Sequence, residues 1–412
     1  MSRSERGPGG SEFTSLDRVN LFSTGLSGTN LERGGSHNLR VTLQAIRLNA
    51  PITKVELAEI TGLTPPSMTN ITRKLLLDGL IIETGRRRGE RGQPAMELAI
   101  NADGAFSVGI NIDRDHITMV ALDFLGGVRA RIVEEIAFAM PEQVADFFTR
   151  NLEAIRASGV VDMDRIAGVG VAMPDDFGRV DLPLRPSDFG IWETFDLRKL
   201  FAAHSLDVFI ENDASAAAIG EFQFGHGQTA QTFLYVLISA GLGGGLVIDG
   251  HPVRGASGRS GEIGFLPIGK ARRSAVNLQD VVSLSGLFAH LAAAGHRDIS
   301  VAGLHELKGA IAKEALVWTE RAADLLCEPL LVINAAIDPE AVFIGGRLPA
   351  KLVDSLVDRL AVNIRHRGAS LPSRAPVLRA ALAEDAAAMG AAILPFSSRF
   401  LPSRAALMKT EA

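Results

Sequence analysis

Asn212 and Asp213 form an amide–carboxylate pair between an apolar run, DVFI, and an alanine-rich run, ASAAAIGE. The apolar run favours a strand and the alanine-rich run favours a helix, so we predict the pair where the strand ends and the helix begins. In α/β folds that junction faces a ligand cleft, and the helix dipole there favours an ionised carboxylate. Asp213 could then accept a hydrogen bond from a ligand hydroxyl or take its proton. The alternative is a plain helix cap, and this stretch alone supports both readings equally.

The elements around this pair alternate between strands and helices in two cycles. The first cycle has a helix near 141–157 and strands predicted at 105–112, 116–124, 128–136 and 166–173. The second has helices around 194–204, from 213 and through 314–333, and strands at 207–210, 232–239, 243–250 and 341–346. Two such cycles predict a duplicated α/β architecture with a cleft between its halves.

Charge is distributed unevenly along the 412 residues, whose formal net charge is −5. Residues 37–100 hold nine Lys and Arg against six Asp and Glu, and residues 1–36 balance to zero. The remaining residues, 101–412, therefore carry the whole negative excess. A small basic module ahead of a large acidic one is typical of a nucleic-acid-binding domain joined to a small-molecule domain.

Cysteine usage and hydropathy limit the class of protein. The single cysteine, Cys327, excludes an intramolecular disulfide, which fits a cytoplasmic protein. Residues 1–36 are polar and rich in Gly and Ser, so we expect a disordered tail and no signal peptide, with a second short tail at 401–412. The charge-free stretch 229–248 is long enough to span a membrane, but its four glycines favour two buried strands. We therefore expect no membrane association.

The basic module, residues 37–100, has the signals of a helix-turn-helix. Thr53 with Glu56 three positions later forms a capping box that starts one short helix, which a glycine ends. Thr64 then caps a further helix whose first residue is Pro65, where a missing N–H has no cost. A helix, a tight turn containing glycine and a second helix make up the helix-turn-helix arrangement.

The outer face of the second of these helices is polar, and a basic hairpin follows it. Side chains that could reach the major groove are Ser67, Thr69, Asn70, Arg73 and Lys74. Two strand-like runs, LIIETG and AMELAI, flank a segment whose arginines could contact phosphates or a minor groove: Arg86, Arg87, Arg88 and Arg91. The alternative is an ordinary helical bundle with a solvated loop. Caps, polar face and basic hairpin occur together in the order of a winged helix, which favours DNA binding.

Several blocks of the chain together resemble the ROK family (repressors, open reading frames and sugar kinases). The blocks outside the helix-turn-helix are IENDASAAAIGE at 210–221, SAGLGGGLVIDG at 239–250, SGEIGF at 260–265 and DPEAVFIGG at 338–346. The resemblance extends over about residues 37–395. It implies an actin/hexokinase-like (ribonuclease H-like) ATPase fold with a central cleft at 101–400, behind an N-terminal winged helix at 37–100.

The resemblance also implies roles for particular residues. In the family's sugar kinases, the Asp of the Asn-Asp pair removes a proton from the sugar hydroxyl, and the pair holds sugar hydroxyls. Asn212 and Asp213 match these positions, and Glu262 matches a sugar-binding Glu. MPDDFG at 173–178 departs from the family's Pro-Gly, and its Asp175 adds a carboxylate near the expected sugar pocket. Asp175 could favour a ligand with more donors, or it could lie on the surface.

Two further departures concern phosphate and metal. The family's phosphate loop, Asp-x-Gly-Gly-Thr, is replaced by NIDRDHI at 111–117, where Asp113 and Asp115 would repel phosphate. The family's structural zinc uses a His that is Phe265 here, together with cysteines that the following segment lacks. Tetrahedral zinc needs four such ligands. We therefore expect neither ATP use nor a zinc site, and no cofactor.

Together these features predict a transcriptional regulator, most simply a repressor of carbohydrate metabolism or transport genes. It would bind operator DNA as a homodimer or higher homo-oligomer, and a sugar or sugar derivative would bind in a non-catalytic cleft. In that case Asp213 holds a ligand and transfers no phosphate. The alternatives are an ATP-dependent sugar kinase, for which GLGGG is the clearest support, and a regulator that has lost its effector.

Overall fold

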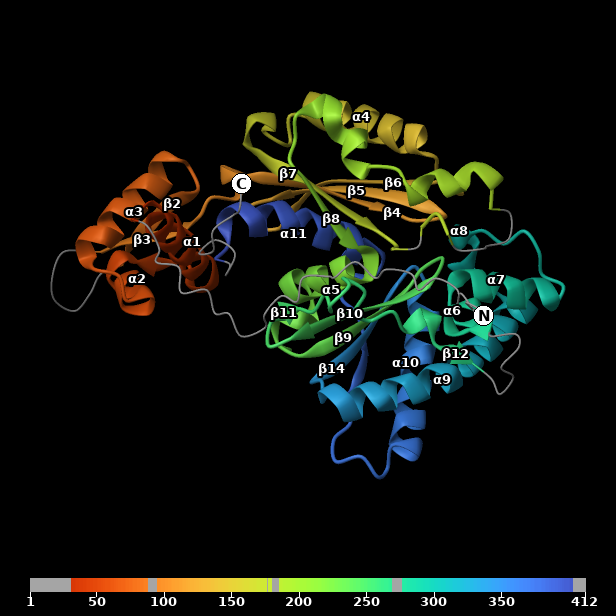
Figure 1. The fold of residues 1–412 in the computed structure, drawn as a ribbon. Coiled ribbons are helices and arrows are strands. Elements are labelled where there is room, and N and C mark those ends of the chain that lie inside the picture. The colour runs from red at the N-terminus through yellow and green to blue at the C-terminus, as the bar shows by residue number, and fades with distance from the viewer. Residues whose placement is uncertain (1–30, 88–94, 176, 180–184, 269–275, 403–412) are drawn as a thin grey trace, which may run out of the picture.

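The computed structural model describes residues 31–87, 95–175, 177–179, 185–268 and 276–402. It has an N-terminal winged helix beside two α/β lobes, which pack on each other through a pair of helices (Figure 1). The predicted α/β class and the duplication are both confirmed.

The winged helix consists of three helices and a small sheet. The helices are α1 (Leu31–Asn49), α2 (Lys54–Thr61) and α3 (Pro65–Leu77). The antiparallel sheet has the order β1 (Ile52–Thr53), β3 (Ala95–Ile100), β2 (Ile81–Arg87). Helix α1 begins at Leu31, so the expectation of a tail over residues 1–36 is wrong for its last six residues.

Local sequence explains where these helices start and stop. Thr53 caps α2, its side chain accepting from the Glu56 N–H while the Glu56 carboxylate accepts from the Thr53 N–H, as predicted. Gly62 ends the helix in the left-handed conformation that suits glycine. Thr64 caps α3, with Pro65 at its first turn. The predicted caps are therefore the observed ones.

The two lobes repeat one sheet topology. In the first lobe the order is β6 (Val128–Glu135), β5 (His116–Asp123), β4 (Phe106–Ile112), β7 (Ile166–Met173), β8 (Val208–Asn212). In the second it is β11 (His251–Pro252), β10 (Leu242–Ile248), β9 (Phe233–Ile238), β14 (Ala341–Gly346), β15 (Val377–Arg379). In each sheet the first three strands are antiparallel and the last two join in parallel. Each lobe is therefore one copy of the same unit.

Helices cover both lobes. The first carries α4 (Pro141–Ser158) and the short helices Ala102–Gly104, Met163–Arg165, Ser187–Glu193 and Leu197–His204. The second carries α6 (Leu278–Val281), α7 (Leu284–Ala293), α8 (Val301–Leu304), α9 (Gly309–Ile337) and α10 (Ala350–Arg367). Its minor elements are His226–Gln228, Ile263–Phe265, β12 (Pro267–Ile268), β13 (Val276–Asn277) and Ala383–Asp385. The helix expected around 194–204 is a 3₁₀ helix, Leu197–His204.

Helices α5 (Asp213–Phe224) and α11 (Ala386–Phe400) lie between the two sheets (Figure 1). Small residues let the two helices approach closely. A Cβ added at Gly390 would lie 1.7 Å from the Ala216 carbonyl oxygen, and one added at Gly220 would lie 2.4 Å from that of Ala386. The alanine-rich run in the sequence therefore serves this packing as well as helix formation.

The core of the winged helix continues into the first lobe. Leu43 and Ile46 of α1 share one apolar cluster with Leu122 of β5 and Phe396 of α11. The Arg47 guanidinium also donates to the side chain of Gln223, near the end of α5. The winged helix is thus packed against the lobes through α1. No helix in the described part of the chain is long and apolar enough to cross a lipid bilayer.

Candidate functional site

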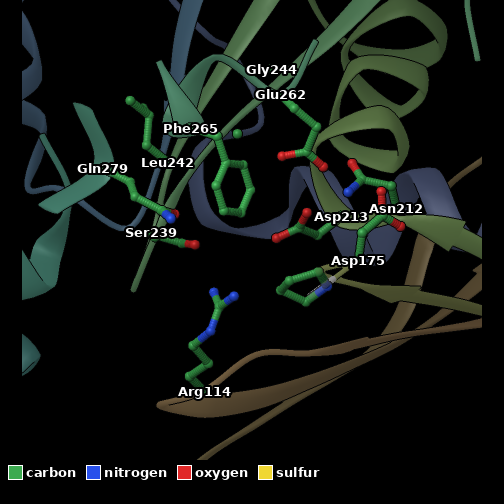
Figure 2. Close-up of a pocket in the computed structure, with 13 residues that line it drawn as sticks. Arg114, Asp175, Asn212, Asp213, Ser239, Leu242, Gly244, Glu262, Phe265 and Gln279 are labelled. Atoms are coloured by element: carbon green, nitrogen blue, oxygen red, sulfur yellow. The ribbon is translucent and has the colours of Figure 1, made fainter. Parts of the chain in front are cut away.

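A polar cavity lined by residues of both lobes opens at the start of α5. Its lining brings together all four residues that sequence analysis assigned to an effector: Asp175, Asn212, Asp213 and Glu262 (Figure 2). Residues that sequence analysis did not assign to it also line the cavity: Arg114, Ser239, Gln279 and Phe265.

Sequence analysis left open whether Asp213 caps helix α5 or faces a ligand, and the structure gives the capping role to Asn212. The Asn212 side chain is the helix cap, because its Oδ1 accepts the Ser215 N–H at 3.0 Å. Asp213 Oδ1 accepts the N–H of the next residue, Ala214, at 2.8 Å. Since Asn212 already caps α5, the Asp213 carboxylate is available to face the cavity, as Figure 2 shows. Only 8% of Asp213 is exposed.

Burial changes the protonation of Asp213. Desolvation, with the nearby negative charge of Asp113, raises its pKa to about 7, against the opposing effects of Arg114 and the Ala214 N–H. The helix dipole was expected to keep this carboxylate ionised. That expectation is wrong near neutral pH, because burial and a second carboxylate outweigh the dipole. Asp213 can therefore gain or lose a proton as its surroundings change.

The other cavity residues come from segments far apart in the sequence. Asp175 follows β7 in the first lobe, whereas Glu262 lies just before the short helix Ile263–Phe265 in the second. The Phe265 ring faces the cavity and is 40% exposed, so it offers an apolar surface for a sugar ring (Figure 2). Ser239 and Gln279 add polar groups from the second lobe.

The turn between β4 and β5 stands where the resemblance implies a phosphate loop. Asp113 is 1% exposed, and its Oδ1 accepts the backbone N–H of Arg114 at 2.7 Å. Asp115 binds His116 Nδ1 at 2.7 Å and Arg347 Nη1 at 2.8 Å. Burial acts to raise the pKa of Asp115, but the hydrogen bond and charges of His116 and Arg347 lower it overall. Arg347 follows β14, so this cluster joins the two lobes.

The residues at the family's phosphate-loop and zinc positions differ from those that the resemblance implies. The β4–β5 turn presents charged side chains where backbone N–H groups would cradle phosphate. Asp113, Asp115 and His116 bring ligand-type atoms within 4.8 Å of one another, but Asp115 is already paired with Arg347 and His116. At the position that the resemblance gives to a zinc-binding His stands Phe265, whose ring cannot ligate a metal.

The polar face of α3 is fully exposed. All five residues that we assigned to the major groove lie on it: Ser67, Thr69, Asn70, Arg73 and Lys74. On the opposite face Met68 and Leu75 are buried in the winged-helix core. The outer face therefore presents donors and acceptors to solvent, and Leu77, the last residue of the helix, is exposed as well.

The wing arginines differ among themselves. Arg86 is exposed on β2, and the described residues supply it with no ion-pair partner. Arg87 pairs with Glu56 at 2.7 Å and Glu97 at 2.6 Å, so its guanidinium joins α2 to the sheet. Arg88 and Arg91 lie outside the described residues.

Comparison with known families places both modules. The ROK family model matches residues 108–397, which is more than half of the chain. A winged helix-turn-helix DNA-binding model matches residues 37–82. The chain therefore carries a winged helix-turn-helix DNA-binding domain.

Among curated proteins, the uncharacterized protein y4fQ of Sinorhizobium fredii is 30% identical over 89% of this chain and 92% of its own length. The xylose repressor of Bacillus subtilis is 28% identical over 56% of this chain and 60% of the repressor. The regulator NagC of Escherichia coli is 24% identical over 53% of this chain and 54% of its own length. The chain thus spans somewhat more than half of the length of each of these two named regulators.

Solved structures show the same fold. A ROK family transcriptional regulator described as a homolog of the E. coli MLC protein superposes with a TM-score of 0.66 at 23% identity, covering 88% of this chain and 96% of that one. A ROK hexokinase from Thermus thermophilus has a TM-score of 0.50 at 27% identity, covering 70% of this chain and 97% of its own. The kinase thus covers a smaller share of this chain than the regulator does.

Proposed function

This chain belongs to the ROK family, and from that premise we propose that it is a transcriptional regulator whose operator binding is controlled by a sugar-type effector. The observation that supports this most is the joining of two sites in one chain. An exposed polar recognition helix lies in the winged helix, and a polar cavity lies between lobes of sugar-kinase fold. Repression, and action in the cytoplasm as a homodimer, belong to the same proposal.

The cavity favours binding over phosphoryl transfer. Kinase chemistry depends on positioning phosphate and neutralising its charge. Here the β4–β5 turn carries Asp113 and Asp115, and Arg347 spans from the second lobe to pair with Asp115. The glycines of β10 support the kinase alternative, but they also serve helix packing, since a Cβ at Gly245 would lie 2.2 Å from the Ala214 carbonyl oxygen. We therefore assign Asp213 the role of holding a ligand hydroxyl.

Helix α5 offers a direct route from the cavity to the DNA-binding module. It begins at Asp213, and Gln223 near its other end accepts a hydrogen bond from Arg47 of α1. A ligand that moves α5 would therefore move α1. Such coupling requires the ligand to favour one arrangement over the other.

The DNA proposal is tested by selecting binding sites from random duplexes with the full-length protein and measuring affinity by gel shift. We expect a palindrome whose half-sites are separated by whole helical turns. Asn70→Ala should weaken the selected site by about 1–3 kcal/mol and relax base preference at one position, because Asn reads a base edge.

Arg86→Ala and Arg87→Ala form a matched pair in this experiment. Arg86 is exposed, so its loss should weaken all sequences alike and reduce the salt dependence of binding. Arg87 is held by Glu56 and Glu97, so its loss should mainly lower the stability of the wing. Failure to enrich any sequence, or enrichment that survives deletion of residues 37–100, would contradict the regulator proposal.

A further inference from the structure

Arg114 gives the cavity a positive charge on the side away from most of its carboxylates. The side chain is 8% exposed, and it extends from the β4–β5 turn toward Ser239 and the centre of the cavity (Figure 2). Asp175, Asn212 and Glu262 lie together on the other side, with Asp213 reaching between the two. The cavity is therefore polarised across its width.

Among the described residues, the Arg114 guanidinium has a single ion pair, and it is a long one. Its Nη1 lies 3.9 Å from Asp113 Oδ1, and that oxygen already accepts the backbone N–H of Arg114 at 2.7 Å. Its Nε is buried and has no hydrogen-bond partner within the part of the chain that the structure describes. A guanidinium offers five donors, and a buried charge without close partners is costly. Arg114 thus keeps donors for a ligand in the cavity.

The surroundings of Arg114 suit an anionic group. A Cβ added at Gly241 would lie 3.1 Å from Nη1, so the absence of a side chain there leaves the guanidinium open to the cavity. Ser239 and Gln279, which line the same side, are uncharged donors. A planar guanidinium with neutral donors beside it can bind carboxylate or phosphate oxygens in a fixed geometry.

We propose that the effector is an acidic sugar, in which a carboxylate or phosphate group pairs with Arg114 while the ring hydroxyls face Asn212, Asp213 and Glu262. This inference rests on the proposed function of the cavity as an effector site. It adds the chemical class of the ligand and a subsite for its charge.

A cationic amino sugar is the opposite possibility, because three carboxyl groups line the cavity. Two of them, Asp175 and Glu262, already interact with other residues of the protein. The third, Asp213, has a pKa of about 7 and is neutral in a large fraction of molecules near that pH. Asp213 therefore contributes less negative charge near neutral pH than an ordinary Asp, whereas the Arg114 charge is permanent.

The test is isothermal titration of the full-length protein with matched sets of ligands. For hexoses and pentoses in turn, the neutral sugar, its amino derivative, its carboxylate derivative and its phosphate ester are compared, with inorganic phosphate as a separate probe. We expect one charged derivative, carboxylate or phosphate, to bind at least about ten-fold tighter than its neutral sugar. The carboxylate and phosphate arms distinguish the two sources of charge.

Three variants assign the preference to Arg114. Arg114→Gln should remove the advantage of the anion, so that the charged derivative and its neutral sugar bind this variant with similar affinity, while Arg114→Lys should restore part of the difference. Arg399→Gln is the matched control, because Arg399 pairs with Asp207 on the surface outside the cavity lining. Thermal melting of each variant verifies that it is folded.

The outcomes separate this inference from the proposed function. If the neutral or amino sugar binds tightest, or if the preference for the anion persists in Arg114→Gln, the acidic-sugar inference is overturned and the effector site remains. If no sugar binds but inorganic phosphate binds in an Arg114-dependent way, the subsite stands and the sugar effector does not. Absence of all binding overturns both.

The pH dependence of the same titration gives an independent readout. Asp213 is faced by Asp113 and Arg114 of the β4–β5 turn, Asp175 after β7 and Glu262 of the second lobe. A bound carboxylate raises the pKa of Asp213 further, so its affinity should fall as pH rises above about 7. A neutral sugar that donates to ionised Asp213 should instead bind more weakly as pH falls below that value.

Discussion

The two lobes contain equivalent hairpins that have diverged in opposite ways. The β4–β5 turn and the β9–β10 turn each join the first two strands of their lobe in chain order, and the two sheets have the same topology. Both close with one backbone hydrogen bond, Asp113 N–H to His116 O and Ser239 N–H to Gly241 O, each at 3.0 Å. The first turn holds charged side chains, and the second runs into a strand of consecutive glycines.

The difference shows that equivalent turns can serve two structural purposes. In the second lobe the absence of side chains lets helix α5 lie against β10, which places Asp213 at the cavity. In the first lobe the side chains fill the space, and Asp115 connects to Arg347 of the other lobe. One hairpin thus positions the ligand-facing helix, and the other joins the lobes and supplies Arg114.

The largest expected effect comes from the glycine hairpin. A Cβ at Gly245 would lie 2.2 Å from the Ala214 carbonyl oxygen, so Gly245→Ala must displace α5. We expect a loss of more than about 3 kcal/mol in the free energy of unfolding, at the upper end of overpacking effects. Chemical denaturation monitored by circular dichroism measures it.

Gly241→Ala is the matched control for that substitution. Its Cβ would meet only side-chain atoms, Arg114 Nη1 at 3.1 Å and Gln279 Oε1 at 3.4 Å. Stability should change little, while ligand binding should fall because the methyl group intrudes on Arg114. Equal stability of the two variants would show that close approach to α5 is not what these glycines provide.

The second largest expected effect, that of substituting Asp213, is an increase in stability. The pKa of Asp213 rises from 3.8 to about 7 on folding, so stability is lost as pH rises through this interval and stays at its lower level above it. Asp213→Asn removes the buried charge but keeps a polar group. We expect it to stabilise the protein at pH 8 by about 2 kcal/mol, and by less at pH 5.

Denaturation curves at pH 5 and pH 8 measure this change in the free energy of unfolding. Titration of the same variant with sugars measures its effect on ligand binding. Asp213→Asn should weaken the binding of a neutral sugar by about 1.5–3 kcal/mol at pH 8, since a charged acceptor is lost. An acidic sugar should lose less, because the ionised carboxylate also repels its charge. A variant that is more stable but binds more weakly is typical of a functional residue whose burial lowers the stability of the folded protein. If stability is unchanged between pH 5 and pH 8, Asp213 is better solvated than its burial indicates.

Features decided by neighbouring residues could be predicted from the sequence. The caps at Thr53 and Thr64, the junction at Asp213 and the glycine run of β10 each depend on a few adjacent residues, and the structure has them where expected. The two-cycle pattern was sufficient for the α/β class, because strand and helix periodicities differ.

Features that depend on contacts between distant segments could not be predicted. Sequence analysis assigned no role to Arg114, because only the fold brings it to the cavity that Ser239 of the other lobe also lines. The pairing of Arg87 with Glu56 and Glu97 likewise depends on other elements, and it adds a structural role to the phosphate contact that the sequence predicts for Arg87. The pKa of Asp213 depends on burial and on Asp113, which is 100 positions away in the chain and has no local signal.

The smallest expected effect concerns the charged hairpin. The Arg347 side chain is 5% exposed and pairs with Asp115 at 2.8 Å and with Glu135, thereby joining the lobes. Arg347→Met keeps the length of the side chain and removes its charge. Asp115 and Glu135 are partly exposed, at 27% and 58%, so water can solvate them afterwards. We therefore expect a loss of about 1–2 kcal/mol, below that of a fully buried pair.

Arg131→Met provides the comparison, because Arg131 also joins segments distant in sequence, pairing with Glu384 and Asp385 from a side chain that is 39% exposed. Exposed pairs contribute about 0–1 kcal/mol, so this variant should lose less than Arg347→Met. Thermal melting in low and high salt separates the two, since the Arg131 pairs are screened more strongly. If both variants melt alike, the cluster at Arg347 behaves as an ordinary surface network. The charged hairpin would then supply Arg114 to the cavity without fixing the two lobes together.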